Sequence, residues 1–182
     1  MGGGFHGGFG NTKGSITQSS TWYKEPKNGC KARVRHYVAT KSLINHIENP
    51  DISGSLKKGI KGGHKEDNFL SSLTKLGAKI VRVVDYPEFN GIKVIYYQLP
   101  EKDKTGKPTS EFRKNIMKKT VYDHNKLPTS TYIARGLGAA NNATTNSGSG
   151  KLPREWRGVD SKGITWRGYC SPTGNLISFF PE

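Results

Sequence analysis

Two stretches in the first half of the chain show the hydrophobic period of an amphipathic helix. Residues 35–48 carry an imperfect apolar stripe that stops before Pro50, and residues 65–76 repeat apolar side chains at intervals of three and four before Gly77. Side chains at these spacings share one helix face, and Pro or Gly ends the element. The pattern therefore predicts a helix over each stretch.

Beyond Gly77 the pattern becomes extended. Residues 79–85 (KIVRVVD) and 92–99 (IKVIYYQL) are rich in β-branched and aromatic residues and flank a turn-like YPEFNG, which predicts an antiparallel pair. A polar loop, EKDKTGKPTS, leads to a predicted third strand over 112–122. Successive side chains of a strand point to opposite faces, so only one of Lys118 and Lys119 can face a given cleft.

The last third of the chain predicts one helix and one hairpin. Residues 129–140 form the helix, the low-complexity loop NNATTNSGSG follows, and residues 164–170 and 175–180 pair across SPTG. The GSGK at the end of the loop is not a phosphate-binding P-loop, because Thr145 and Leu152 stand where that motif needs Gly and Ser or Thr. The predicted fold is α+β, with N-terminal helices packed against antiparallel β-sheets.

Composition adds a partner class to this picture. The 182 residues carry 29 Lys and Arg against 14 Asp and Glu, a net charge of +15, which favours a polyanion such as nucleic acid. A basic face for an acidic protein is the alternative. We expect a flexible Gly/Ser-rich lead-in over 1–24 and one domain over 25–182.

Several other classes of protein are disfavoured. Cys30 and Cys170 lie far apart without a CxxC pair, so we expect free thiols and neither a zinc site nor a disulfide framework. No apolar run approaches the roughly 20 residues of a membrane span. The first ten residues, MGGGFHGGFG, lack the apolar core of a signal peptide, so secretion would require a larger polypeptide to carry the domain.

The candidate chemistry centres on two histidines separated by a basic, glycine-punctuated loop. His46 ends the first predicted helix, and His64 follows Gly62 and Gly63 just before the second. Imidazole can take a proton from a ribose 2′-hydroxyl or give one to a leaving 5′-oxygen near neutral pH, and a cation can stabilise the phosphorane. A lone histidine in a basic chain is more often structural, so the case depends on the context of the pair.

That context has three parts, in this order along the chain. They are His46-Ile47 with the later Gly62-Gly63-His64 turn, KKTVYD at 118–123, and ISFFPE at 177–182. Together they resemble the bacterial branch of the EndoU ribonuclease family, as found in toxin domains of contact-dependent inhibition and other polymorphic toxin systems. No single motif is specific, whereas their order over residues 46–182 is.

The resemblance implies an EndoU or RNase A-like architecture and a site that uses neither metal nor cofactor. It implies RNA cleavage through 2′-hydroxyl attack, leaving 2′,3′-cyclic phosphate and 5′-hydroxyl ends, with His46, His64 and Lys119 as catalytic residues. We assign His64 as base and His46 as acid, with the reverse left open. Lys118 is the alternative to Lys119, and otherwise a substrate contact.

The resemblance also places Ser178 and Phe180 beside the substrate. The wider family commonly has Tyr at the second position, so Phe180 can stack but cannot donate a hydrogen bond. The implied partners are RNA, with tRNA as the expected target, and a cognate immunity protein. The implied location is the cytoplasm of a target bacterium, reached by secretion or delivery from a cell surface.

Two other functions stay open at this point. DHNKLP, with His124, resembles the start of an HNH metal site, although no histidine follows it. A non-catalytic RNA-binding protein is the other reading, with bases stacking on Trp156, Trp166, Tyr96 and Tyr97. His36 is expected to be structural or to face RNA, and His6 has no assigned role.

Overall fold

A computed structural model describes residues 18–24, 31–54, 56–147 and 149–182. Within these ranges the helices are α1 (Lys41–Glu48), α2 (Glu66–Lys75) and α3 (Thr129–Thr145). The strands all pair in antiparallel sheets, which confirms the predicted α+β class. None of the described helices has the length and apolar character needed to traverse a bilayer.

The strands of the described ranges form five small sheets. Two-stranded pairs are made by β1 (Gln18–Lys24) with β2 (Lys31–Tyr37), β3 (Pro50–Asp51) with β4 (Lys61–Gly62), and β7 (Pro100–Lys102) with β8 (Pro108–Phe112). One three-stranded sheet has the order β5 (Lys79–Asp85), β6 (Ile92–Gln98), β9 (Met117–Tyr122). The other has the order β10 (Glu155–Val159), β11 (Thr165–Cys170), β12 (Leu176–Pro181).

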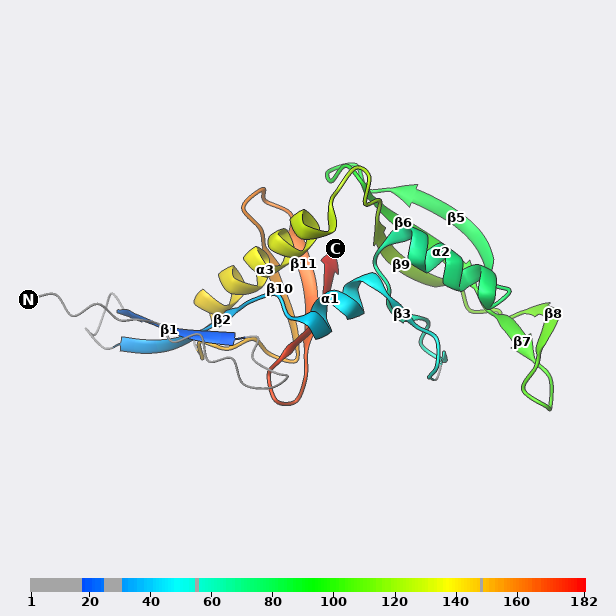
Figure 1. The fold of residues 1–182 in the computed structure, drawn as a ribbon, viewed down its shortest axis with the longest axis horizontal. Coiled ribbons are helices and arrows are strands. Elements are labelled where there is room, and N and C mark those ends of the chain that lie inside the picture. Colours follow the sequence, from blue (N-terminus) through cyan, green and yellow to red (C-terminus); the bar gives the residue numbers. More distant parts are fainter. Residues whose placement is uncertain (1–17, 25–30, 55, 148) are drawn as a thin grey trace, which may run out of the picture.

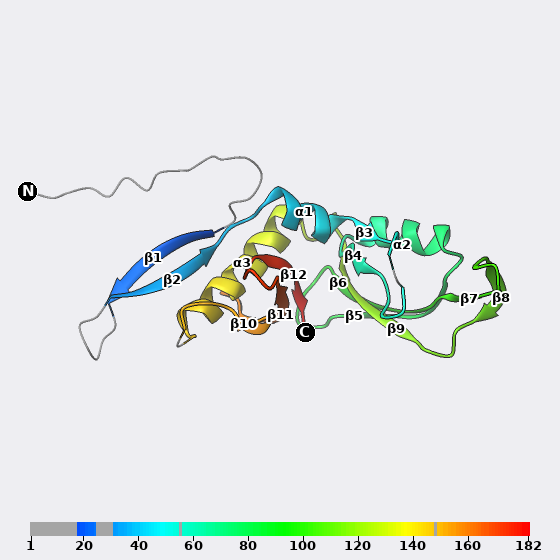
Figure 2. The same cartoon turned by 90° about the horizontal axis from the view of Figure 1, so that it is seen from below.

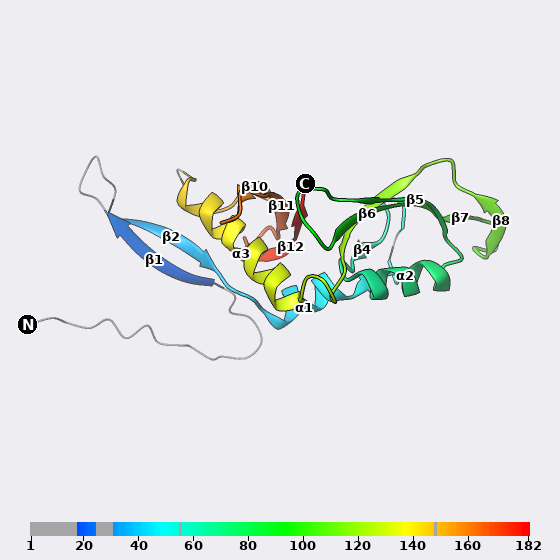
Figure 3. The same ribbon diagram turned by 90° about the horizontal axis from the view of Figure 1, so that it is seen from above.

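The two three-stranded sheets lie on opposite sides of an elongated molecule. Figure 1 shows α3 with β10 and β11 on one side, and α2 with β5, β6 and β9 on the other. The C-terminal strand β12 lies between them, as the views from below and above also show (Figures 2 and 3). Since β9 and β12 are each an edge strand of their sheet, the two sheets meet edge to edge at the centre.

Each side has its own apolar core. One core gathers Tyr132, Trp166 and Phe179 from α3, β11 and β12, together with Leu43 and Ile47 of α1. The other packs α2 on one face of the β5–β6–β9 sheet through the side chains Phe69, Leu73, Ile95 and Val121. Burial of apolar surface in these two clusters stabilises each sheet against its helix, and Ile92 and Tyr122 extend the first cluster to the β5–β6–β9 sheet.

The first predicted helix begins later than expected. The periodicity placed it over 35–48, whereas the backbone stays extended as β2 through Tyr37 and α1 starts at Lys41. Thr40 caps the helix, since its Oγ1 accepts a hydrogen bond from the Leu43 amide at 3.1 Å. Tyr37 is held as a strand residue because its amide donates to Asn141 Oδ1 at 2.6 Å.

The N-terminal predictions fall partly outside the described residues. His6, Cys30 and residues 1–17 of the predicted lead-in lie outside them, and Gln18–Lys24, at the end of that lead-in, forms β1. His36 lies exposed on β2 instead of on a helix. The described thiol, Cys170, is free and buried.

The middle of the chain agrees with the predicted pair and corrects its surroundings. β5 and β6 pair antiparallel over nearly the predicted residues, and α2 ends before Gly77, whose φ is 63°. The segment 101–110, expected to be a loop, is part of the β7–β8 hairpin. Asp103 fixes its turn by accepting from the amides of Thr105 and Lys107.

The last helix is longer than predicted, and the final hairpin gains a strand. α3 continues to Thr145 because Ala139, Ala140 and Thr144 stay buried along the face that packs on β2 and β10. It begins after Pro128 without a side-chain cap. β11 and β12 pair as expected, and the unpredicted β10 adds to β11.

Candidate active site

His46 lies at the end of α1 beside the turn that carries His64. Leu43 and Ile47 bury the apolar face of α1, which leaves His46 half-buried at the junction of the two sheets. Its carbonyl accepts a hydrogen bond from the Gly63 amide at 2.9 Å. Gly62, with φ of 59°, is packed so closely that an added Cβ would lie 2.6 Å from the same carbonyl oxygen and 3.2 Å from His46 Nδ1.

His64 is tied into both neighbouring elements through its backbone. Its amide donates to Ile47 O of α1 at 2.5 Å, and its carbonyl accepts from the Tyr122 amide of β9 at 2.7 Å. The Gly62-Gly63 turn and these two bonds bring together two histidines that lie 18 positions apart in the chain. His46 and the Gly62-Gly63-His64 turn, which form one motif in the sequence, are therefore also neighbours in the structure.

The side chain of His64 is held in a defined tautomer. Its Nδ1 lies 2.8 Å from Thr120 O, and because a carbonyl can only accept, Nδ1 carries the proton. The lone pair of the neutral ring is then on Nε2, which lies 3.3 Å from Ser178 Oγ. The ring is only 3% exposed and stacks on Phe180 with centroids 5.5 Å apart.

Both imidazoles are shifted towards the neutral form. Burial lowers the pKa of His64 well below 6.5, helped by the charges of Lys119 and His46 and opposed by the bond to Thr120. Burial and Lys119 also lower the pKa of His46, by a smaller amount. The assignment of His64 as the base has this physical support, and burial is the main cause of its neutral form.

Lys119 is buried in the same place. Met117, Lys119 and Val121 are the buried side of β9 and Lys118 is exposed on the other, so the predicted separation of the two lysines is confirmed. Lys119 is 9% exposed, and its Nζ donates to Ile60 O at 3.3 Å. Burial lowers the pKa of its ammonium from 10.5 to about 7.

The C-terminal strand completes the cluster. Ser178 and Phe180 lie on the same face of β12, where Ser178 is buried and Phe180 is partly exposed. Tyr169 of β11 pairs with Ser178 in the strand register, and its ring lies 6.3 Å from that of Phe180. Phe180 therefore lies against the imidazole of His64, and Tyr169 lies beside Phe180.

All six residues predicted for the site line one cavity of about 750 Å³ between the two sheets. The same cavity has further basic and aromatic side chains that the sequence did not single out as site residues: Lys58, Lys61, Tyr86, Arg154, Arg167 and Tyr169. Arg167 is engaged by Glu155 and Glu182. The positions of these additional side chains depend on long-range contacts. The predicted hairpin of the last two strands was the one signal that could have placed Arg167 and Tyr169.

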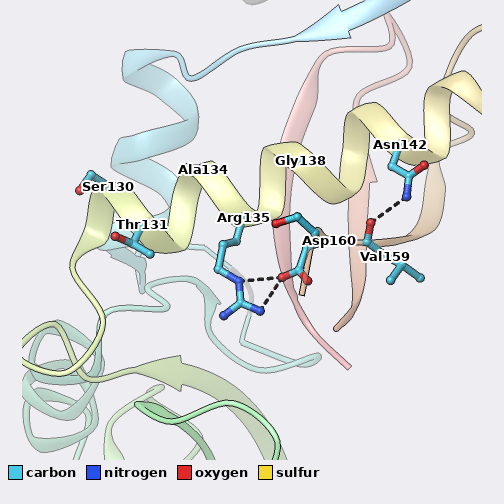
Figure 4. Close-up of a pocket in the computed structure, with 9 residues that line it drawn as sticks. Ser130, Thr131, Ala134, Arg135, Gly138, Asn142, Val159 and Asp160 are labelled. Carbon is cyan, nitrogen blue, oxygen red and sulfur yellow. Dashed lines mark hydrogen bonds and ion pairs between the residues drawn. The ribbon is translucent and has the colours of Figure 1, made fainter. Parts of the chain in front are cut away.

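A second cavity of about 660 Å³ lies between α3 and β10 (Figure 4). Its charged groups are already paired: Arg135 donates to Asp160 from two nitrogens at 2.7 Å and stacks over the ring of Phe89. None of the predicted site residues lines it. We therefore take this cavity as part of the packing of α3.

The two alternative functions find less support in the geometry. His124 lies outside the cavity of the histidine pair, with its Nδ1 3.2 Å from Asp67 Oδ2. Trp156, Trp166 and Tyr97 are buried and cannot stack on RNA, which leaves Tyr96 as the accessible member of that set. Within the described ranges no three His, Cys, Asp or Glu side chains group closely enough to hold a metal ion.

Comparison with known proteins agrees with the toxin resemblance in outline. The chain is 29% identical over 127 residues to a protein of Yersinia mollaretii named tRNA nuclease CdiA, and 30% identical over 134 residues to one of the same name from Escherichia coli STEC_O31. These alignments cover 69% and 70% of this chain and 4% of each relative. The chain thus spans a small part of the length of these relatives, and no protein-family model matches it.

Proposed function

We propose that this chain is an EndoU-type endoribonuclease toxin domain that cuts tRNA without a metal ion. The observation that carries the proposal is the meeting of His46, His64 and Lys119 in one cavity, with the lone pair of His64 Nε2 directed at Ser178. The names of the similar proteins support the substrate class. The net charge of +15 supports binding to RNA.

The chemistry follows from the protonation states. His64 Nε2 takes the proton of a ribose 2′-hydroxyl, and the freed oxygen attacks the adjacent phosphorus. The P–O5′ bond breaks, and His46 gives its proton to the leaving oxygen. The products are a 2′,3′-cyclic phosphate and a 5′-hydroxyl, and no water is consumed.

Ser178 marks where the substrate hydroxyl would lie. In the free protein its hydroxyl donates to His64 Nε2, the atom that must accept the 2′-hydroxyl proton. A bound ribose replaces this contact, and Ser178 can then hold the ribose or the base edge. Phe180 packs on the other side of the imidazole and fixes its plane.

Lys119 supplies the positive charge. An ammonium with a pKa of about 7 is only partly protonated in the free protein near neutral pH. A phosphodiester entering the cavity favours the charged forms of both Lys119 and His46, because an opposite charge nearby raises the pKa of a base. Substrate binding thus favours the protonated forms of His46, the acid, and Lys119, the cation. The deeply buried His64 stays neutral and acts as the base.

Biological role follows as part of the same proposal. A cell that makes a tRNA nuclease needs an immunity protein that blocks this cavity, and the domain acts after delivery into the cytoplasm of a target bacterium. In the two relatives the matching segment is about 4% of a much longer polypeptide. We assign delivery to the remainder of such a polypeptide.

The test is cleavage of total RNA in EDTA by the wild type, His46→Ala and His64→Ala, with His36→Ala as the matched control. His36 is an exposed histidine on β2, outside the cavity. We expect both site variants to lose at least about 100-fold in rate, as acid–base catalysis is worth 10²–10⁴. Cleavage that stops in EDTA would point to a metal nuclease, and binding without cleavage to a non-catalytic RNA-binding protein.

A further inference from the structure

The outer face of the β5–β6–β9 sheet carries an aromatic side chain between two cations. The register aligns Arg82 of β5 with Tyr96 of β6 and Tyr96 with Lys118 of β9. Helix α2 covers the opposite face through Ile95 and Val121, so this row points away from the apolar core. Arg82 and Lys118 are exposed and Tyr96 is partly exposed.

The row is organised as a stacking surface. The Arg82 guanidinium carbon lies 4.0 Å from the centroid of the Tyr96 ring, which is the geometry of a cation–π pair. Neighbouring strands lie about 4.8 Å apart, so the row is about 10 Å wide from Lys118 to Arg82. Both an aromatic ring and a guanidinium plane are surfaces on which an unpaired base stacks.

The row continues directly from the cavity of the histidine pair. Tyr96 and Lys118 line that cavity together with Val94 and Thr120 of the same face, and Thr120 is the residue that fixes His64. Arg82 lies one strand further out. A chain whose phosphate sits between His46 and His64 would therefore leave the cavity across Lys118 and Tyr96.

We propose that Arg82, Tyr96 and Lys118 form a nucleotide-binding subsite that takes one unpaired base of the RNA next to the cut. The base stacks on the Tyr96–Arg82 pair, and the adjoining phosphate contacts Lys118. The inference rests on the proposed RNA substrate. It adds a preference for single-stranded target positions, because a base held in a duplex cannot reach the ring.

The test measures binding in the His64→Ala background, so that the RNA stays intact. The probe is a short single-stranded RNA and a set of the same RNA with one base removed at each position in turn. We expect Tyr96→Ala to weaken binding roughly 5- to 150-fold, the range for loss of one stacked base. Tyr96→Phe should restore it, and Phe112→Ala, which removes an exposed aromatic on β8, should change nothing.

Base removal identifies the contact. In the Tyr96-containing protein, one abasic position should weaken binding by a similar factor, and in Tyr96→Ala the same position should have almost no further effect. Equal abasic profiles for the two proteins would overturn the subsite, and so would Tyr96→Ala binding RNA as tightly as Phe112→Ala. Either result would leave the face as a surface for another molecule, such as an acidic protein.

Two further measurements test the cations of the subsite and distinguish the subsite from the proposed nuclease activity. Lys118→Gln should flatten the slope of log affinity against log salt by about 0.7, the value for one phosphate contact on a single strand, and Lys104→Gln in the β7–β8 turn should not. Arg82→Gln, which removes part of the stacking surface, should weaken binding of the intact RNA more than binding of the RNA that lacks the stacked base. Cleavage is scored with His64 present. If Phe112→Ala cuts RNA and Tyr96 proves neutral, only the subsite fails; if RNA is bound through Tyr96 and never cut, only the nuclease proposal fails.

Discussion

Replacing Lys119 by Met should stabilise the fold while abolishing the proposed activity. Lys119 is 9% exposed and its Nζ donates a 3.3 Å hydrogen bond to Ile60 O, while no acidic side chain of the described residues forms an ion pair with it. A charge in this position loses most of its hydration without a counter-charge in return, which is why its pKa falls from 10.5 to about 7. Met has a similar length and keeps the apolar contacts of the stem.

The magnitude follows from proton linkage. The unfolded chain holds the Lys119 proton up to a pH of about 10, and the folded chain releases it above about 7. Between these values the unfolded state binds more protons, so stability rises with pH by up to about 1.4 kcal/mol per pH unit. The destabilisation by Lys119 is therefore about 4 kcal/mol near pH 7 and falls to below about 1 kcal/mol near pH 10.

The assay is thermal or denaturant unfolding of the wild type and Lys119→Met at several pH values. The variant should be more stable near pH 7, and the difference should shrink by about 3 kcal/mol by pH 10, or roughly 6–12 °C in Tm for a domain of this size. Lys118→Met, which removes an exposed cation from the same strand, should show no such convergence. A difference between the wild type and Lys119→Met that does not depend on pH would refute the reasoning.

Two further predictions concern catalysis, and a third concerns the stability of the turn before His64. Lys119→Ala should lower single-turnover cleavage by about 100-fold or more, whereas Lys118→Ala should mainly weaken binding and flatten its salt dependence; severe loss in Lys118→Ala alone would reverse the assignment. The kcat/KM profile should peak on the acid side of neutrality and fall as the pH rises, because the pKa of His46 is lowered from 6.5 and Lys119 loses its proton near its pKa of about 7, while His64 stays neutral; an increase above pH 7 would contradict these roles. Gly62→Ala should disturb His46 and destabilise the fold by at least about 1 kcal/mol, since its Cβ would meet His46 O at 2.6 Å; Gly138→Ala on α3, with open space around it, is the control.

The period of a strand was enough to predict that Lys118 and Lys119 point to opposite faces, whereas the choice of Lys119 as the site residue came from the family resemblance. Met117, Lys119 and Val121 follow strict alternation, and both flanking apolar side chains lie in the core of the α2 side. The alternation of side chains between the two faces of a strand is a local property, so it can be predicted without knowledge of the fold. The helix of residues 66–75 was predictable for the same reason, because its apolar residues recur at three and four.

Long-range contacts account for what the sequence did not show. The periodicity places Tyr37 in the apolar stripe of a helix. In the structure it lies in a strand, where its amide donates to Asn141, 104 positions away. The β7–β8 hairpin has exposed side chains on both faces, so it carries no apolar alternation to detect. Tyr169 and Arg167 enter the cavity only because β11 pairs with β12, and the deep burial of His64 depends on Phe180 closing over it.

The most direct test of the central claim is the chemistry of the cut ends. Purified tRNA is incubated with the protein in EDTA, and the fragments are analysed for their terminal groups. Attack by the 2′-hydroxyl, with His64 as base and His46 as acid, predicts a 2′,3′-cyclic phosphate on one fragment and a 5′-hydroxyl on the other. Fragments that carry 5′-phosphates would contradict the account, because they require an activated water in place of the ribose hydroxyl.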